Sequence, residues 1–400
     1  MLIAGEASGD LLAAELVAAL RHELAALPAP TRDLQPLWTP LEPRFFGAGG
    51  PRMQSAGVEI AFDMTAHSVI GLADALKGYL KFKRIFTSLH QMALERLPDT
   101  IICVDFGGFN RRFAAAIRRH LRARRGPFRN WNPKLVQYVS PQVWASRENR
   151  VFQIARDYDL LLGIFPFEKE WYARRVPRFR VEFVGHPLVD RYATLPRPPR
   201  TASVSDPASP LVLLLPGSRE SELRRHLPPM LGALTLLRER LPRLRARLVL
   251  PQESLWQRAG IDSLPPGLDT RVGGLPESLA EADLAIASTG TVTLECAWYG
   301  VPTVAMYKAS WSTYHIGKRI IKVNHLAMPN LLAGESLFPE FIQNAASAEN
   351  LAAAAHDLLT NLTRREQIRT RLGEVIQSLG PPGASRRAAR AILDLATPQS

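Results

Sequence analysis

The stretch Leu211-Val-Leu-Leu-Leu-Pro-Gly-Ser-Arg219 decides the fold of this chain. Five consecutive apolar residues, Leu211–Leu215, are typical of a buried parallel strand. The strand runs into a glycine turn, and the polar residues Glu220-Ser221-Glu222 then begin a helix. A strand, a glycine turn and a helix in this order form the repeating unit of a parallel α/β sheet.

The same alternation continues on both sides of this stretch. Downstream, we predict strands and helices at Leu231–Arg240, Ala246–Leu250, Asp283–Ala287, Thr291–Tyr299 and Thr303–Tyr307. Upstream, we predict them at Leu2–Gly5, Leu11–Leu24, Arg44–Gly47, Thr100–Asp105, Phe113–Arg124, Lys134–Val139, Leu160–Ile164 and Val181–Gly185. Strands separated by helices indicate parallel sheets with crossover helices.

The segment Pro196–Pro210 separates the two series of strands. It is rich in proline and small polar residues, a composition typical of a linker or surface loop. We therefore expect an α/β protein with two Rossmann-like domains facing a cleft, residues 1–200 and 201–345. The helical tail, residues 346–400, packs either on the N-terminal domain or on a partner chain in a homodimer.

Composition restricts the partners of the chain. The 400 residues are 46% hydrophobic and 22% charged, which is typical of a globular protein rather than a disordered one. The net charge of +13 favours an anionic partner: nucleic acid, an acidic membrane surface or a phosphorylated substrate. The basic residues are dispersed and form no nucleic-acid-binding module, so we expect no nucleic acid.

Cysteine content and hydropathy restrict the compartment. The two cysteines, Cys103 and Cys296, lie in apolar runs and have neither a disulfide nor a zinc spacing, which fits a reducing compartment. No run of about 18 apolar residues occurs, so membrane contact is expected to be peripheral. Ala66–Met92 mixes apolar and basic residues, and lies either on an anionic bilayer or packed on the sheet.

Two motifs in the N-terminal half are candidate site elements. The turn Ala4-Gly-Glu-Ala-Ser-Gly-Asp10 joins a strand to a helix, where Gly5 and Gly9 permit close approach of a ligand. Ser8 or Asp10 is a candidate cap for that helix, and a plain turn is the alternative. Asp105 ends a strand, where open α/β sheets place their ligands. It is either a general base or a cap of the next helix.

Two motifs in the C-terminal half are typical of phosphate binding. Gly217, Ser218 and Arg219 follow a strand and can bind an anion. Ser288, Gly290 and Thr291 lead from a strand into a helix whose first N–H groups can hold a pyrophosphate. Glu295, four residues after Thr291, can accept hydrogen bonds from ribose hydroxyls, or it is a surface glutamate.

Several motifs in order along the chain resemble the bacterial lipid-A-disaccharide synthases. They are Ala4–Asp10, Gly49–Met53, Tyr138–Trp144, Phe165–Lys169, Phe183–Pro187, Leu214–Arg219, Ser288–Glu295 and Met328–Gly334. The resemblance implies the glycosyltransferase-B architecture and a reaction without metal or cofactor. A UDP-2,3-diacylglucosamine donor would transfer its sugar to 2,3-diacylglucosamine 1-phosphate. The product would be a β-1,6-linked disaccharide 1-phosphate, with release of UDP.

The resemblance also implies roles for single residues. Those in the substrate-binding motifs are Gly5, Glu6, Ser8, Gly9, Gly217, Ser218, Arg219, Ser288, Gly290, Thr291, Glu295 and Asn330. Asp105 matches the candidate general base, with Glu6 or His186 as the next candidate. The location implied is cytoplasmic, on the inner face of the bacterial inner membrane. The family has more residues before Ala4, so the first strand is expected to be short here.

One departure from the family pattern keeps other functions open. The family reads Asp-x-Pro-Asp-Phe-Asn where this chain reads Asp105-Phe-Gly-Gly-Phe-Asn110. Gly108 replaces the second aspartate, which either leaves Asp105 as the base or signals altered chemistry. The alternatives are an inactive paralogue, another UDP-GlcNAc-dependent glycosyltransferase or an epimerase of the same architecture.

Overall fold

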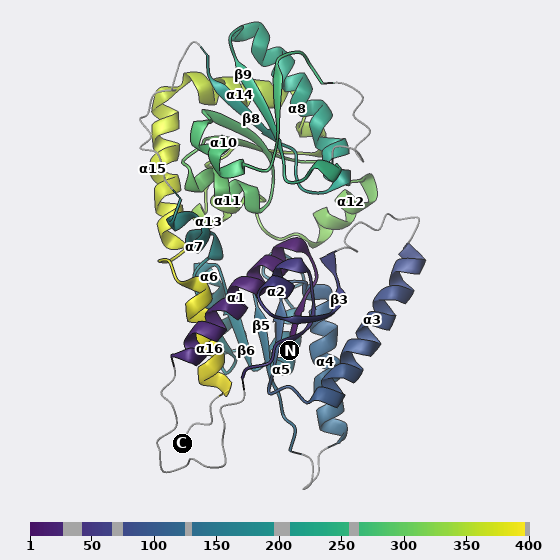
Figure 1. Ribbon diagram of the computed structural model, residues 1–400. Coiled ribbons are helices and arrows are strands. Elements are labelled where there is room, and N and C mark those ends of the chain that lie inside the picture. The colour runs from purple at the N-terminus through teal and green to yellow at the C-terminus, as the bar shows by residue number, and fades with distance from the viewer. Residues whose placement is uncertain (27–41, 66–74, 125–129, 196–208, 256–263, 397–400) are drawn as a thin grey trace. The chain divides into compact units, whose positions relative to one another are not determined.

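A computed structural model describes residues 1–26, 42–65, 75–124, 130–195, 209–255 and 264–396 (Figure 1). The chain divides into two compact units. Unit 1 comprises Met1–Arg191 and Leu379–Ser400, and unit 2 comprises Tyr192–Ser378. Most of the segment predicted as a linker, residues 196–208, lies outside the described residues. The helical tail is divided between the two units.

Unit 1 is built on a parallel sheet with the strand order β3-β2-β1-β4-β5-β6-β7 (Figure 1). The strands are β1 (Leu2–Ala4), β2 (Phe46–Gly49), β3 (Glu59–Asp63), β4 (Thr100–Val104), β5 (Lys134–Tyr138), β6 (Leu160–Gly163) and β7 (Arg180–Phe183). The helices are α1 (Ala7–Ala25), α2 (Pro51–Ser55), α3 (Ala75–Arg96), α4 (Gly107–Ala123), α5 (Arg150–Asp157), α6 (Pro166–Ala173), most of α7 (Pro187–Ala193) and α16 (Ala384–Ala396).

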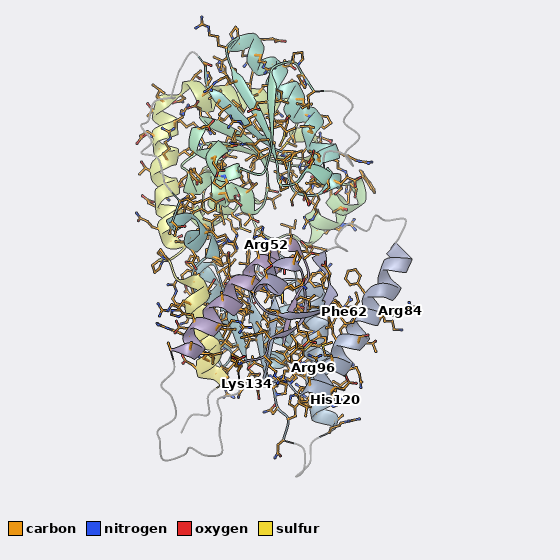
Figure 2. All side chains as sticks on the ribbon, in the orientation of Figure 1. Arg52, Phe62, Arg84, Arg96, His120 and Lys134 are labelled. Atoms are coloured by element: carbon orange, nitrogen blue, oxygen red, sulfur yellow. The ribbon has the colours of Figure 1, made fainter. Side chains whose placement is uncertain are left out.

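The central strands of unit 1 are buried on both faces. Ile101 and Cys103 of β4 and Leu135 of β5 are inaccessible to solvent and belong to the same apolar cluster as Phe113 of α4. This burial explains why the strands are short continuous apolar runs rather than alternating ones. Figure 2 labels Arg52, after β2, and Lys134, at the start of β5, near opposite ends of the sheet.

Unit 2 contains a second parallel sheet, with the order β10-β9-β8-β11-β12-β13. Its strands are β8 (Leu211–Leu215), β9 (Arg245–Leu250), β10 (Leu268–Val272), β11 (Leu284–Ser288), β12 (Thr303–Tyr307) and β13 (Glu340–Ile342). Its helices are α8 (Glu220–Arg240), α10 (Leu275–Glu281), α11 (Thr291–Trp298), α12 (Trp311–Ile320), α13 (Met328–Ala333), α14 (Ala348–Thr360) and α15 (Leu362–Ser378), with the 3-10 turn η4 (Gln343–Ala345). The two parallel α/β sheets predicted from the sequence are confirmed.

The structure corrects several predicted elements. Helix α8 runs from Glu220 to Arg240 through Pro228 and Pro229, so the predicted helix start at Glu220–Glu222 and the predicted helix Leu231–Arg240 belong to one helix. Helix α4 begins at Gly107 rather than at Phe113. Strands β3, β10 and β13 were not predicted because they lie at or near sheet edges and are largely exposed or half-buried.

Helix α3 covers most of the predicted basic amphipathic segment Ala66–Met92. Residues 66–74 lie outside the described residues, as do the side chains of residues 75–81. In the described part, Phe82, Phe86 and Met92 pack against the core of unit 1, while Lys83 and Arg84 are exposed (Figure 2). No helix in the described ranges is long and apolar enough to cross a membrane.

Candidate active site

The strand order places most of the predicted site residues at two similar positions. In unit 1 the chain winds from β1 to β2 and β3 on one side, and from β4 to β7 on the other. In unit 2 the corresponding reversal lies between β8 and β11. Ligands of open α/β sheets bind at the carboxyl ends of the strands that flank such a reversal. Gly5 and Asp105 follow β1 and β4, while Gly217 and Gly290 follow β8 and β11.

Asp105 has a left-handed backbone that three hydrogen bonds hold in place. Its φ is 49° and that of Phe106 is 44°. The N–H of Asp105 donates to the carbonyl oxygen of Tyr138 over 2.9 Å. Its carbonyl oxygen accepts from the side-chain amides of Asn110 (2.9 Å) and Gln137 (3.2 Å). Such strained non-glycine conformations cluster at functional sites and persist only where the surroundings enforce them.

The glycine turn after β1 lies against this strained pair. A Cβ at Gly5 would lie 2.1 Å from Cγ of Phe106, so only glycine fits there. A Cβ at Gly9 would be 3.8 Å from Cβ of Asp105. The structure therefore brings the turn Gly5–Gly9, including Glu6 and Ser8, next to Asp105 at one sheet edge.

Asp10 serves a different helix from the one expected. Helix α1 begins at Ala7 with Glu6 at its N-cap, so Ser8 and Asp10 lie inside the helix and do not cap it. The buried Asp10 carboxylate instead accepts from the backbone N–H groups of Gly50 (2.8 Å), Arg52 (3.0 Å) and Met53 (3.1 Å). It thus fixes the start of α2 beside the turn after β1. The N-cap of α4 is Phe106 rather than Asp105.

In unit 2, the turn Gly217–Arg219 is organised by Glu222 of α8. Oε2 of Glu222 accepts from the backbone N–H groups of Ser218 (3.1 Å) and Arg219 (3.3 Å). Oε1 pairs with the Arg219 guanidinium at 3.1 Å. Gly217 has a φ of 117°, and a Cβ there would lie 2.4 Å from Oε2 of Glu222. The predicted anion site therefore contains a carboxylate of the protein itself, while the Arg219 side chain remains 62% exposed.

In the second predicted phosphate-binding motif, the space around Gly290, just before helix α11, is open. Ser288 ends β11, and Gly290, with a φ of 136°, precedes the first residue of α11, Thr291. No described atom lies within 4 Å of the position that a Cβ would take at Gly290. The carbonyl oxygen of Gly290 accepts from the Thr293 hydroxyl over 2.6 Å. The hydrogen bond from Thr293 therefore fixes the loop, and the open space at Gly290 lets a ligand approach its backbone.

Glu295 and Asn330 differ in the partners that they already have. The phenol of Tyr192 donates to Oε2 of the half-buried Glu295 over 2.6 Å. Asn330 is fully buried, and its amide nitrogen donates to the Phe338 carbonyl oxygen (2.8 Å) and to Glu340 (2.6 Å). Its amide oxygen accepts from the Phe338 N–H over 2.8 Å. These bonds hold α13 to the segment that leads into β13. The side chain of Asn330 therefore positions this segment, and its amide is already fully hydrogen-bonded within the protein.

His226 is a residue beside the candidate donor site that the sequence did not indicate. This buried side chain joins two strand ends of unit 2. Its Nδ1 lies 2.7 Å from the carbonyl oxygen of Pro216, after β8, and its Nε2 accepts from the N–H of Lys308, after β12, over 3.0 Å. Burial lowers its pKa below the usual range. A neutral ring that donates through Nδ1 and accepts through Nε2 satisfies both contacts.

Comparison with known proteins identifies the family. The family model described as lipid-A-disaccharide synthetase matches residues 1–393. The lipid-A-disaccharide synthase of Geobacter sulfurreducens is 39% identical over 99% of this chain and 96% of its own length. That of Alkalilimnicola ehrlichii is 37% identical over 98% of this chain and 97% of its own. The chain belongs to the lipid-A-disaccharide synthetase family. The predicted family and the glycosyltransferase class are therefore confirmed.

Solved structures with the same fold include both transferases and epimerases. A putative UDP-N-acetylglucosamine 2-epimerase from Listeria monocytogenes has a TM-score of 0.57 at 14% identity, covering 98% of this chain and 95% of that one. CalG4, the calicheamicin glycosyltransferase, has a TM-score of 0.57 at 17% identity, covering 96% of this chain and 95% of that one. At these identities the likeness shows the fold alone, which is the glycosyltransferase-B architecture expected for a lipid-A-disaccharide synthetase.

Gly108, where this lipid-A-disaccharide synthetase family member departs from the expected motif, lies at an unconstrained position. Gly108 is the second residue of α4 and is exposed. No described atom lies within 4 Å of the position of an added Cβ, and Gly108 is not among the positive-φ glycines. Neither space nor backbone conformation therefore requires glycine at this position.

Two buried titratable groups, Glu168 and His186, follow strands β6 and β7 of unit 1. Glu168 accepts from the N–H groups of Ile164 and Phe165, each at 3.0 Å, and from the Trp144 indole at 3.0 Å. Burial raises its pKa to about 7. His186 accepts at Nδ1 from the Leu188 N–H over 3.1 Å, and burial lowers its pKa to about 3. A ring this weakly basic is a poor acceptor for the proton of an attacking hydroxyl.

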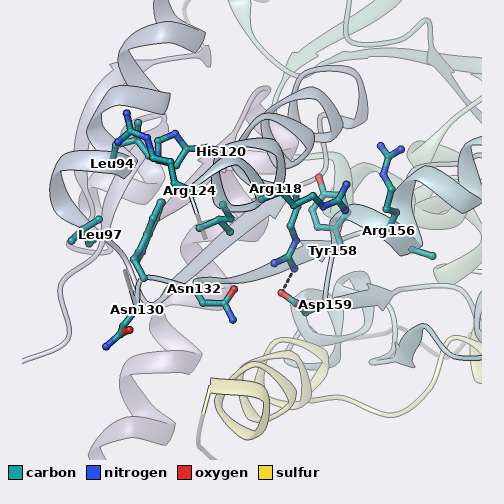
Figure 3. Close-up of a pocket in the computed structure, with 14 residues that line it drawn as sticks. Leu94, Leu97, Arg118, His120, Arg124, Asn130, Asn132, Arg156, Tyr158 and Asp159 are labelled. Carbon is teal, nitrogen blue, oxygen red and sulfur yellow. Dashed lines mark ion pairs between the residues drawn. The ribbon is translucent and has the colours of Figure 1, made fainter. Parts of the chain in front are cut away.

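A cavity of about 800 Å³ lies at the other edge of the unit 1 sheet (Figure 3). Its lining includes Asn132, just before β5, and Asp159, just before β6, and Asp159 pairs with Arg118 at 2.5 Å. These residues precede the strands, whereas Asp105 follows one. Since ligands of open α/β sheets bind at carboxyl ends, this cavity is not a candidate for the reaction.

Proposed function

We propose that the protein transfers the sugar of UDP-2,3-diacylglucosamine to 2,3-diacylglucosamine 1-phosphate, forming a β-1,6-linked disaccharide 1-phosphate and UDP. The observation that carries the proposal is the position, within each folded unit, of the motifs that resemble the family. Gly5 and Asp105 flank the strand reversal of unit 1, and Gly217 and Gly290 flank that of unit 2. Unit 1 would bind the acceptor, and unit 2 would bind the donor.

Asp105 is the proposed general base. The 6-hydroxyl of the acceptor attacks the anomeric carbon of the donor in line with the leaving UDP, so the configuration inverts. The carboxylate of Asp105 takes the hydroxyl proton as the new C–O bond forms, and the bond from the anomeric carbon to UDP breaks. General-base catalysis of this kind contributes typically about 10²–10⁴-fold. The rigid backbone of Asp105 supports this role, because a base must be held in a fixed position.

The leaving UDP gains negative charge, which unit 2 can stabilise. Arg219 is a largely exposed cation after β8, and the first N–H groups of α11 follow the open turn at Gly290. Donors fixed in advance at the position of developing charge lower the barrier without reorganisation. We assign Glu295 to the ribose hydroxyls, and Asn330 to holding the α13 segment that borders α11.

Peripheral attachment to an anionic membrane follows from the same function. The substrates are acylated, and the chain carries a net charge of +13. The exposed Lys83 and Arg84 lie on α3, in the segment Ala66–Met92 that we expected to contact a bilayer. Basic residues close to a membrane surface each contribute on the order of 1 kcal/mol to its attraction. We propose that α3 contacts the cytoplasmic face of the bacterial inner membrane.

Product analysis tests the function directly. The purified protein is incubated with UDP-diacylglucosamine and diacylglucosamine 1-phosphate in detergent micelles, and the lipids are analysed by mass spectrometry. The expected outcome is a disaccharide monophosphate formed in equal amount to UDP. Epimerisation of UDP-N-acetylglucosamine without an acceptor would favour the epimerase alternative. No turnover of either substrate by the folded protein would favour an inactive paralogue.

A further inference from the structure

Four arginines gather around the N-terminal parts of α4 and α5, and α4 begins two residues after Asp105. Two lie early in α4, one in the segment between β5 and α5, and one at the start of α5. We call them the arginine cluster: Arg111, Arg112, Arg147 and Arg150. Each of these guanidiniums is close enough to others of the cluster to interact electrostatically.

The cluster is built into the packing of two helices. The Arg111 guanidinium donates to Oε1 of Gln153 in α5 over 2.6 Å. The N–H of Arg150 donates to the carbonyl oxygen of Arg147 over 3.0 Å, and Arg147 has a left-handed φ of 54°. Arg111 and Arg150 are half-buried, while Arg112 and Arg147 are exposed. The cluster is therefore a partly enclosed cationic site rather than four scattered surface charges.

The positive charge of the cluster is only partly balanced, because Asp157 attracts Arg111 without forming an ion pair with it. Within the described residues, none of the four guanidiniums forms an ion pair. The acidic side chains nearby have other partners: Glu148 pairs with Arg175 at 3.6 Å, and Asp157 pairs with Arg156 at 2.8 Å. Burial lowers the pKa of Arg111, and the charges of its neighbours in the cluster lower it further. The pKa of Arg150 is lowered by the same two causes. A bound anion would relieve this repulsion.

We propose that the arginine cluster binds the phosphate of the acceptor sugar. The inference rests on the proposed function, which gives the acceptor a phosphomonoester. Such a group carries a charge of about −1.5 to −2 at neutral pH, and its oxygens match the paired N–H groups of a guanidinium. Arg111 lies in the second turn of α4, about two helical turns or less along the chain from Asp105. One acceptor could thus be held by its phosphate while its hydroxyl reaches Asp105.

The partial burial of the cluster favours a small phosphorylated ligand over a bilayer. A membrane surface is best met by exposed, extended basic side chains such as Lys83 and Arg84 of α3. A half-buried guanidinium such as Arg111, fixed by Gln153, instead suits one anion in one geometry. We therefore assign the acceptor phosphate to the arginine cluster and lipid headgroups to the exposed Lys83 and Arg84 of α3.

The test compares acceptors with and without the phosphate. Steady-state constants are measured in detergent micelles for the wild type, Arg111→Gln and Arg150→Gln. Arg119→Gln, an exposed arginine of α4 outside the cluster, is the matched control. We expect the cluster variants to raise the KM for the phosphorylated acceptor roughly ten-fold, since charge-assisted hydrogen bonds are lost. Their KM for the dephosphorylated acceptor and for the donor should remain unchanged, as should all constants of Arg119→Gln.

A binding measurement separates loss of the site from loss of the fold. Inorganic phosphate, compared with chloride at equal ionic strength, should raise the Tm of the wild type and of Arg119→Gln, but not that of Arg150→Gln. Without phosphate, the Tm of Arg150→Gln should equal or exceed that of the wild type, because a like-charge repulsion is removed. If Arg150→Gln has a lower Tm than the wild type without phosphate, and phosphate raises its Tm as much as that of the wild type, the proposal is wrong.

Three further outcomes distinguish a failure of the inference from a failure of the proposed function. Equal KM values of the wild type for the two acceptors would show that the phosphate is not recognised, which overturns the inference while leaving the proposed function intact. If the cluster variants lose co-sedimentation with anionic phospholipid vesicles but keep the acceptor KM, the cluster binds headgroups and the inference is wrong. Absence of product with every acceptor would instead contradict the proposed function, and the phosphate-dependent Tm would then test the anion site alone.

Discussion

The phenol of Tyr192 donates to Oε2 of Glu295 over 2.6 Å. Both residues belong to unit 2, Tyr192 at the end of α7 and Glu295 in the second turn of α11. The Tyr192 ring also packs against Trp298 and Tyr299, with centroid distances of 5.9 and 5.6 Å. An aromatic anchor therefore fixes the orientation of the carboxylate that we assign to the ribose hydroxyls.

Replacing Tyr192 by phenylalanine should weaken donor binding. The variant keeps the ring contacts and removes only the hydrogen bond to Glu295. A hydrogen bond to a charged group contributes about 1.5–3 kcal/mol, and part of it is regained from water. We therefore expect the KM for the UDP-sugar to rise several-fold, with the acceptor KM unchanged. Tyr314→Phe, at another tyrosine of unit 2, is the control. Equal UDP affinity of the wild type and Tyr192→Phe in calorimetry would contradict the assignment.

Replacing Arg219 by alanine should weaken UDP binding. The guanidinium is largely exposed at the end of the β8 turn, where a phosphate can accept charge-assisted hydrogen bonds. We expect the Kd for UDP to rise by roughly ten-fold or more. The control is Arg224→Ala, which removes an arginine in the first turns of α8 whose guanidinium pairs with Glu220 at 2.8 Å. Unchanged UDP affinity in Arg219→Ala, or an equal loss in Arg224→Ala, would exclude a specific phosphate contact.

Introducing a side chain at Gly108 should stabilise unit 1. The site is open and helical, so Gly108→Ala should add about 0.5–1 kcal/mol by restricting the unfolded chain. Gly108→Asp should add a further ~0.3–1 kcal/mol, because an anion at a helix N-terminus is favourable. Urea unfolding of the two variants separates these effects. Destabilisation by alanine would mean that the position is constrained in a way that the free volume does not reveal.

The candidate site was predictable where local sequence determines the structure. The apolar runs before Asp105 and Gly217 reveal buried strands, and glycines after a strand reveal turns that backbone or ligand must approach. Because parallel strands of one sheet end at the same edge, Gly5 could be placed near Asp105 in unit 1, and Gly217 near Gly290 in unit 2, without knowing the strand order. Asp105 could be identified as a candidate site residue from its position alone, because it directly follows Val104, the last residue of β4.

Other parts of the site depend on contacts between distant segments and could not be predicted. Tyr192 and Glu295 are 103 positions apart, and His226 and Lys308 are 82 apart. Nothing in the local sequence of either partner indicates the other. Glu222 was predicted only as part of a helix start, although its carboxylate occupies the turn that was expected to bind an anion. The helix start at Glu220 and the helix Leu231–Arg240 were predicted separately, and the structure joins them through Pro228 and Pro229, residues that usually interrupt a helix.

Glu168 should make stability depend on pH. Its pKa rises from 4.5 in the unfolded chain to about 7 in the fold because of burial. Between these values the folded state retains a proton that the unfolded state has lost. The contribution is therefore fully present below pH 4.5 and is lost as the pH rises through 7, a change on the order of 3 kcal/mol.

Glu168→Gln removes this titration. The difference in unfolding free energy between wild type and variant should therefore shift in favour of the variant as the pH rises from 4.5 to 7. Urea unfolding at a series of pH values measures it. The control is Glu95→Gln, at an exposed glutamate of α3. A difference between wild type and Glu168→Gln that stays constant over this range would show that Glu168 does not retain its proton.

Asp105→Asn is the substitution that most directly tests the proposed chemistry. Asparagine tolerates the left-handed φ of 49° found here, so the backbone and its bonds to Tyr138, Asn110 and Gln137 should persist. The base is lost, however, and kcat should fall by at least about 10²-fold. UDP affinity and Tm should stay close to those of the wild type, because the nucleotide is assigned to unit 2.

Asp105→Ala provides the matched comparison. It removes the same carboxylate and also places alanine at a positive φ, which costs about 1 kcal/mol or more. The two variants should therefore lose kcat to a similar extent, while only Asp105→Ala should show a lower Tm. If UDP binding falls together with the rate in Asp105→Asn, the residue is structural. If activity survives within a few-fold, another group is the base, and Glu6 becomes the next candidate, since the buried His186 is too weakly basic.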